Sequence, residues 1–134
     1  MAAGEIVIPI VAVIDIVTAR QKGRTLAAAI GFSSSEQILI ATAISEAARN
    51  ILQYAGKGEI VLNQIQEGIR DGILIVARDE GPGIPNIQRA MQDGFSTSGG
   101  LGLGLPGIKR LMSEMNIVST PEKGTTVALK KWKS

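Results

Sequence analysis

Histidine and cysteine are both absent from the 134 residues of this chain. Without histidine, the chain lacks the usual general base, the commonest metal ligand, any Ser-His-Asp triad and a phosphohistidine of its own. Without cysteine, it forms no disulfide, has no thiol nucleophile and cannot bind a metal through thiolates. Any chemistry must therefore depend on carboxylates, a bound metal ion or backbone dipoles.

Aromatic residues and net charge are also scarce. Aromatic residues make up 3% of the chain and the formal net charge is +2, so we expect no nucleic-acid partner. The apolar run at 6–13 is short and contains Pro9, so we expect neither a membrane span nor a signal peptide. These absences are compatible with the cytoplasm, which is the location we expect.

The apolar periodicity predicts the element order β-α-α-β-β-loop-α-β-β. Strands are expected at 6–13, 59–66, 72–79, 116–120 and 125–131, and helices at 15–30, from Ser33 to near Gly56, and from the glycine loop to about Met115, with a further short helix after Pro85. We expect one domain over 1–134, built as an α/β (α+β) two-layer sandwich with the helices on one face of a mixed sheet.

Two groups of basic residues stand out. Lys123 and the segment Lys130–Lys133 are expected to guard an edge strand. Arg20, Lys22 and Arg24 fall on the first helix, where they either meet an acidic partner or are simply solvated.

Six glycines occur in the fifteen residues from Asp93 to Gly107, directly before an apolar helical pattern. Glycine lets the backbone approach a ligand closely, and the N–H groups at a helix start attract anions. We interpret this run as a phosphate-binding lid, with an ordinary mobile surface loop as the alternative. The dinucleotide pattern G-x-G-x-x-G also occurs at 102–107, but the strand that this motif requires does not precede it.

Four polar residues, Glu46, Arg49, Asn50 and Gln53, fall on one face of the second helix because they are spaced at i, i+3, i+4 and i+7. This spacing can place the carboxylate of Glu46 beside a substrate hydroxyl while the amide oxygen of Asn50 binds Mg²⁺. A plain solvated helix face is the alternative.

Asp79 directly follows an apolar strand, and Gly81 and Gly83 permit a sharp turn after it. A carboxylate only accepts hydrogen bonds, so its natural partner is a ligand donor such as an exocyclic amine. The alternative is a tight turn built from common turn residues.

In their order along the chain, these segments resemble the motifs of the GHKL family of ATP-binding domains. Glu46–Asn50 is similar to the N box, Asp79–Gly83 to the first glycine box, Gly100–Gly104 to the second, and Gly124–Thr126 to the final G-T element. Within the family, the segments 93–102 and 104–111 are similar to the small serine kinases of bacterial partner-switching systems, in particular the switch kinases of the stressosome.

The resemblance implies a Bergerat-type fold that binds ATP and Mg²⁺. It implies that Asp79 binds the adenine amine, aided through water by Gly83 and Thr125, and that Asn50 is the direct protein ligand of Mg²⁺. Glu46 would orient or deprotonate the acceptor hydroxyl, and Arg49 would position Glu46 or the phosphates. The other implied nucleotide-binding residues are Tyr54, Gly81, Ile84, Ser96, Thr97, Ser98, Gly99, Gly100, Leu101, Gly102, Leu103, Gly104 and Leu105.

The implied activity is an ATP-dependent protein serine/threonine kinase that phosphorylates STAS-domain proteins and then activates a PP2C-type phosphatase. Tyr54 departs from the pattern, because many relatives have a basic residue or histidine at this position. Three alternatives remain open: an anti-sigma factor, a non-catalytic ATP-gated interaction module, and the detached catalytic half of a histidine kinase.

Overall fold

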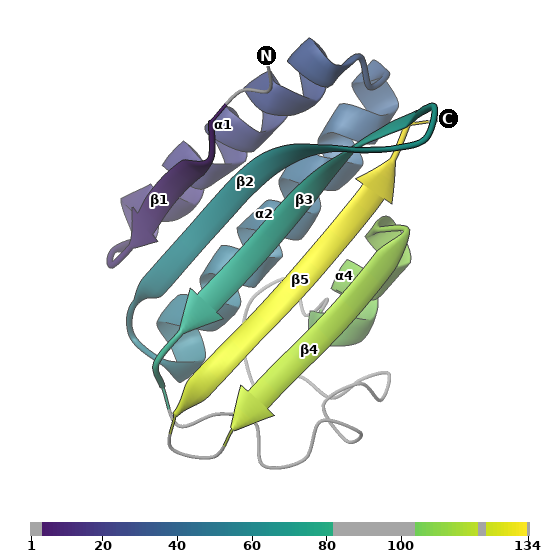
Figure 1. Cartoon of the computed structure of the whole chain (residues 1–134). Coiled ribbons are helices and arrows are strands. Elements are labelled where there is room, and N and C mark those ends of the chain that lie inside the picture. The colour runs from purple at the N-terminus through teal and green to yellow at the C-terminus, as the bar shows by residue number, and fades with distance from the viewer. Residues whose placement is uncertain (1–3, 82–103, 121–122, 134) are drawn as a thin grey trace.

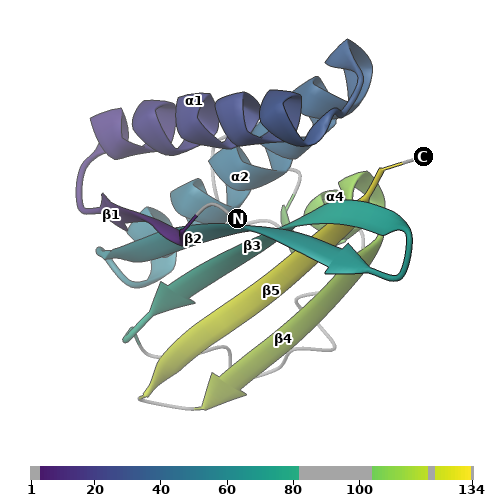
Figure 2. The same ribbon diagram turned by 45° about the horizontal axis from the view of Figure 1, so that its top comes forward.

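The computed structural model describes residues 4–81, 104–120 and 123–133. In these residues, one face of a five-stranded sheet is covered by helices and the other face is open, which confirms the two-layer sandwich (Figures 1 and 2). No helix within these ranges is long and apolar enough to cross a membrane.

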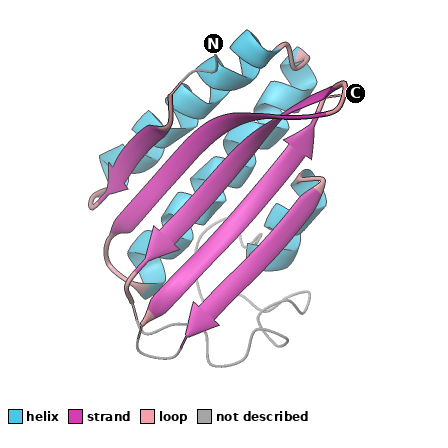
Figure 3. Cartoon of the chain, viewed as in Figure 1, coloured by secondary structure: helices cyan, strands magenta, loops and turns pink. Residues whose placement is uncertain are grey.

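The predicted order of helices and strands is confirmed (Figure 3). The elements are β1 (Ile6–Ile10), α1 (Val13–Ile30), α2 (Ser34–Tyr54), β2 (Gly58–Glu67), β3 (Arg70–Asp79), α4 (Gly104–Leu111), β4 (Glu114–Thr120) and β5 (Gly124–Trp132). The short helix expected after Pro85 lies outside the described residues.

The sheet has the strand order β1-β2-β3-β5-β4, and all four pairings are antiparallel. The expectation of a mixed sheet was therefore wrong. Two helices, α1 and α2, lie between β1 and β2 in the chain. The chain runs along the sheet once in each helix, and it therefore enters β2 antiparallel to β1. α4 connects β3 to a parallel β4, but β5 inserts between these two strands and pairs antiparallel with both.

This position of β5 also corrects the interpretation of the lysines. β5 is an inner strand, so Lys130 and Lys131 do not guard an edge. The Lys131 ammonium instead donates a hydrogen bond of 2.9 Å to the carbonyl oxygen of Leu111, the last residue of α4. A cation at this end of a helix stabilises the unpaired carbonyl groups.

Local sequence signals determine the ends of α1 and α2. Gly31 ends α1 with a φ of 109°, a conformation that favours glycine. Ser33 caps α2: its hydroxyl oxygen accepts a hydrogen bond from the Glu36 N–H at 3.2 Å, and the Glu36 carboxylate accepts one from the Ser33 N–H. This reciprocal capping box pairs two N–H groups that a helix start otherwise leaves open.

α2 is the central helix, because it packs against α1, α4 and the sheet. Its apolar stripe consists of the buried side chains of Ile40, Ile44, Ala47 and Ile51. These side chains pack with the helix-facing residues of β2, β3 and β5 in a single hydrophobic core. This packing fixes the distance between α2 and the sheet.

Several predicted boundaries shift. β1 ends at Ile10 rather than at 13, because α1 already begins at Val13, and β4 begins at Glu114 rather than at 116. The β2–β3 ladder extends to the pair Glu67 and Arg70, whose side chains form an ion pair at 3.3 Å, so only Gly68 and Ile69 form the turn. α4 ends at Leu111 rather than near Met115, because the Ser113 N–H donates to the Lys130 carbonyl and draws the chain into β4.

Candidate functional site

Helix α2 carries the first group of predicted site residues. Glu46 is buried, with 4% of its surface exposed, and Asn50 one turn later is half-buried. A solvated helix face would leave Glu46 in water, so this residue does not fit that alternative. Burial of a carboxylate is costly unless it has a partner or a function.

The partner of Glu46 is Arg49. The Glu46 Oε1 and Arg49 Nε atoms lie 3.8 Å apart, which is an ion pair but too long for a hydrogen bond. Nε is buried and has no hydrogen-bond partner in the part of the chain that the structure describes, although 41% of the Arg49 side chain is exposed. Among the described residues, no group donates a hydrogen bond to the Glu46 carboxylate. Within this part of the chain, Arg49 is therefore the charged neighbour of the carboxylate, and neither carboxylate oxygen is held by a hydrogen bond.

Asp79, the last residue of β3, occupies the second part of the predicted site. Its Oδ1 atom accepts hydrogen bonds from the backbone N–H groups of Gly81 at 2.9 Å and Thr125 at 3.3 Å. Within the described part of the chain, Oδ2 accepts none. One carboxylate oxygen thus fixes the orientation of the side chain, and the other remains available to a single external donor.

Gly124 allows the start of β5 to lie this close to Asp79. Its φ is 118°, and a Cβ atom here would collide with the Asp79 carbonyl oxygen and lie 2.8 Å from the Glu80 Cα atom. Any side chain would both strain the backbone and push Thr125 away from Asp79. Gly124 therefore determines where the Thr125 N–H points.

The buried Thr125 has a second polar contact. Its hydroxyl lies 3.0 Å from that of Ser119, the residue opposite it on β4. Asp79, Thr125 and Ser119 consequently form a continuous polar row across β3, β5 and β4 at one end of the sheet. Ser119 was not predicted, and nothing in its local sequence distinguishes it from other strand serines.

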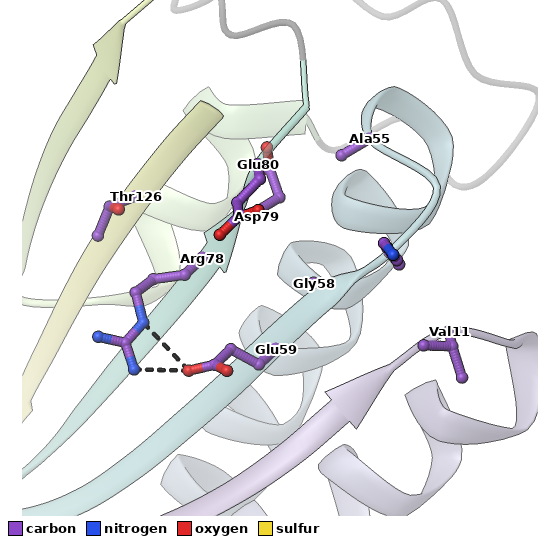
Figure 4. Close-up of a pocket in the computed structure, with 9 residues that line it drawn as sticks. Val11, Ala55, Gly58, Glu59, Arg78, Asp79, Glu80 and Thr126 are labelled. Atoms are coloured by element: carbon purple, nitrogen blue, oxygen red, sulfur yellow. Dashed lines mark hydrogen bonds and ion pairs between the residues drawn. The ribbon is translucent and has the colours of Figure 1, made fainter. Parts of the chain in front are cut away.

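A groove of about 610 Å³ also borders Asp79 (Figure 4). Its described lining comprises Val11, Ala55, Lys57, Gly58, Glu59, Arg78, Asp79, Glu80 and Thr126. Arg78 pairs with Glu59 and Thr126 across the strands, so these side chains lie on the sheet face away from the helices. α2 contributes neither Glu46 nor Asn50 to this groove. The groove is therefore not the site that these two residues border.

Most of the predicted lid, including the segment 96–103, lies outside the described residues, and so do the predicted nucleotide-binding residues Gly83 and Ile84. Gly104 begins α4 as expected, and the half-buried Leu105 packs against the hydrophobic core. Tyr54 ends α2 with half of its surface exposed.

The possible metal ligands among the described residues suit a magnesium ion that is bound mainly by a nucleotide. The described residues contain no group of three or more acidic side chains that could hold a metal by themselves. The amide of Asn50 has no hydrogen-bond partner among them, so its oxygen is available as a ligand. Mg²⁺ commonly takes one or two protein ligands and completes its shell with phosphates and water.

The chain belongs to the family described as Histidine kinase-, DNA gyrase B-, and HSP90-like ATPase, which matches residues 35–133. Membership of this ATPase family implies the use of ATP. The chain is 54% identical to "Serine/threonine-protein kinase RsbT" of Bacillus subtilis (strain 168), over 88% of this chain and 89% of that protein. This similarity supports protein kinase activity and confirms the predicted class of enzyme.

Two further proteins are similar to this chain. An "Anti-sigma F factor" of Caldanaerobacter subterraneus subsp. tengcongensis is 37% identical over 69% of this chain and 68% of that protein. The solved structure of the RsbU and RsbW domains of Rv1364c from Mycobacterium tuberculosis matches 98% of this chain with a TM-score of 0.68 and 21% identity. The chain spans 34% of that longer polypeptide, and this likeness shows the fold alone.

Proposed function

We propose that the chain is a partner-switching serine/threonine kinase that transfers the γ-phosphoryl group of ATP to a STAS-domain protein and then activates a PP2C-type phosphatase. The observation that carries the proposal is the buried carboxylate of Glu46, one helical turn from Asn50, in a chain 54% identical to RsbT. The proposed site of action is the cytoplasm, within a stressosome pathway.

In this proposal the two parts of the site divide the work. Asp79 accepts the adenine amine at Oδ2, while Gly81 and Thr125 hold Oδ1. On α2, Asn50 would supply one oxygen to Mg²⁺, which when bound neutralises charge on the phosphate oxygens. Phosphoryl transfer requires mainly such positioning and charge neutralisation.

Glu46 would act on the substrate. The serine or threonine oxygen forms a bond to the γ-phosphorus as the bond to the β-γ bridging oxygen breaks, and ADP leaves with that oxygen. The hydroxyl proton passes to the Glu46 carboxylate. Arg49, 3.8 Å from that carboxylate and partly exposed, is placed to orient it. No histidine is needed at any step.

The 37% identity to an anti-sigma F factor favours one second candidate, an anti-sigma factor of the same fold. Such a protein would use ATP binding to hold a sigma factor. An anti-sigma factor would co-purify with a sigma factor, whereas the kinase would transfer the γ-phosphoryl label of ATP to a STAS-domain protein.

The test incubates the purified protein with Mg²⁺, γ-labelled ATP and a STAS-domain protein encoded near its gene, followed by acid treatment. We expect an acid-stable label on the STAS protein with the wild type, and at least about 100-fold slower transfer with Glu46→Gln, the usual effect of losing a general base. The matched control is Glu36→Gln, which changes a capping glutamate on the same helix and should leave transfer intact.

Tight ATP binding without transfer to any STAS protein would overturn the kinase proposal and favour the anti-sigma factor. An acid-labile label would indicate phosphohistidine on the partner and would favour the detached histidine kinase half instead.

A further inference from the structure

Two glycines next to Asp79 pack closely against the C-terminal end of helix α2. Gly58 begins β2 and is the cross-strand partner of Asp79, whereas Gly81 follows Asp79 by two residues. A Cβ atom on Gly58 would strike the carbonyl oxygen of Arg78 and would lie 2.7 Å from the Ile51 Cγ2 atom and 3.1 Å from the Asp79 Cβ atom. Real Cβ atoms do not tolerate such separations, so a side chain at either glycine requires something to move.

The contacts of both glycines converge on the C-terminal end of α2. A Cβ atom on Gly81 would lie 2.5 Å from the Cβ atom of Ala55, the C-cap residue that directly follows α2. Ile51, which Gly58 contacts, lies in the last turn of the helix, four residues before Ala55. The two glycines next to Asp79, Gly58 across the strand pair and Gly81 along the chain, therefore both pack against this end of α2.

These contacts matter because α2 also carries Glu46 and Asn50. Asn50 directly precedes Ile51, so the Gly58–Ile51 contact lies one residue from the proposed Mg²⁺ ligand. Packed interiors transmit small displacements because they contain few voids. A side chain at position 58 would therefore displace α2 from the end of β3.

We propose that Gly58 is a positioning residue that sets the distance between the purine half of the nucleotide site, at Asp79, and the phosphate half, at Asn50 on α2. This inference rests on the proposed ATP site. Gly58 lies in none of the four GHKL motifs of the sequence, and its role follows from these contacts. A ligand that engages both halves binds better than one that engages a single half only while their spacing matches the ligand.

The test compares two ligands in the Gly58→Ala variant. ATP with Mg²⁺ spans both halves, whereas adenosine engages only the half at Asp79, whose bonds to Gly81 and Thr125 do not involve Gly58. We expect ATP–Mg²⁺ affinity, measured by titration calorimetry, to fall at least tenfold. Adenosine affinity, measured by ligand-observed NMR, should change less than threefold, so the ratio of the two affinities falls.

Gly72→Ala is the matched control. A Cβ atom on Gly72 would lie 2.7 Å from the Lys131 carbonyl oxygen, a similar clash between strands at the opposite end of β3. This variant should lose stability but keep the wild-type ratio of affinities. Ala55→Val adds bulk at the second contact with α2 and should lower the ratio as Gly58→Ala does, which keeps the test decisive if Gly58→Ala does not fold.

The positioning role would be overturned if Gly58→Ala, or Ala55→Val where Gly58→Ala does not fold, kept the wild-type ratio of ATP–Mg²⁺ affinity to adenosine affinity. It would also be overturned if Gly72→Ala lowered this ratio by the same amount. Failure of the wild type to bind ATP would instead reject the proposed function. The two failures are therefore distinguishable.

Discussion

The backbone N–H of Thr125 donates a hydrogen bond of 3.3 Å to Oδ1 of Asp79, across 46 residues of sequence. The bond joins the first glycine box to the G-T element, two motifs that the sequence keeps far apart. It forms because β5 inserts beside β3, so that Asp79 and Thr125 become cross-strand partners. The carboxylate is consequently oriented before any ligand arrives, and binding need not include the entropic cost of ordering it.

Asp79→Asn should lower ATP affinity by about 10- to 100-fold, because a hydrogen bond to a charged group contributes about 1.5–3 kcal/mol. The amide has nearly the same size, so the melting temperature should change little. ITP, which has an oxygen in place of the adenine amine, should lose less affinity than ATP. Calorimetric titration of both nucleotides measures this change in preference.

The control for this prediction is Asp71→Asn, which alters the other aspartate of β3 at the far end of the strand. It should leave both affinities unchanged. Equal losses of ATP and ITP affinity in Asp79→Asn would show that Asp79 does not bind the adenine amine.

Asn50→Ala should raise the Mg²⁺ concentration needed for half-maximal phosphoryl transfer roughly tenfold, the effect of about 1.4 kcal/mol. The reason is the loss of the proposed protein ligand, while phosphates and water still hold the ion. Titration of Mg²⁺ at saturating ATP measures the shift. Asn63→Ala on β2 is the control, and overlapping Mg²⁺ curves for Asn50→Ala and wild type would remove Asn50 from the metal site.

Gly124→Ala should impair both folding and ATP binding, and Gly68→Ala separates the two causes. Both glycines have positive φ, but a Cβ on Gly68 would meet no atom within 4 Å. Gly68→Ala should therefore lower the free energy of unfolding by only the conformational cost, about 1–2 kcal/mol. Gly124→Ala adds a clash with Asp79, worth roughly a further 1–3 kcal/mol, and should reduce ATP affinity at least tenfold. Denaturant unfolding and calorimetry test both, and normal ATP affinity in folded Gly124→Ala would contradict the role assigned to its close packing.

Local signals in the sequence were sufficient for most of the fold. The start of α2 near Ser33 and the end of α1 at residue 30 were predicted correctly, because the capping box of Ser33 with Glu36 and the C-cap Gly31 act through their own backbone neighbourhood. Neighbouring strands depend on the whole chain, and no local pattern shows that β5 lies between β3 and β4. The lysines of β5 consequently resembled those of an edge.

The same distinction applies to the site. The spacing of Glu46, Arg49 and Asn50 was readable from helical periodicity, but the burial of Glu46 depends on what packs beside α2. Met115 fits both a helical and a strand period, so the end of α4 was ambiguous until the Ser113–Lys130 hydrogen bond was known. Gly58 carried a weak signal, since a glycine at a strand start often marks a close approach of another backbone.

Trp132→Phe should reduce stability without affecting ATP binding. The Trp132 Nε1–H donates a hydrogen bond of 2.7 Å to the Glu114 carboxylate, and the ring lies under the Arg70 guanidinium, 4.3 Å from its centroid. Phenylalanine keeps an aromatic face for Arg70 but loses the donor, which should cost about 1 kcal/mol and lower the melting temperature by about 3–5 °C. Trp132 pairs with Gly72, at the opposite end of β5 from Thr125, so ATP affinity should remain unchanged.

The double variant with Glu114→Gln assigns this loss to the hydrogen bond. If the bond between Trp132 and Glu114 is the cause, then each single change already removes or weakens it, and their effects on the free energy of unfolding should add to more than the effect of the double change. Strict additivity would instead attribute the loss to the smaller ring. A fall in ATP affinity in either single variant would mean that the two ends of β5 are coupled, contrary to a site fixed by contacts around Asp79 alone.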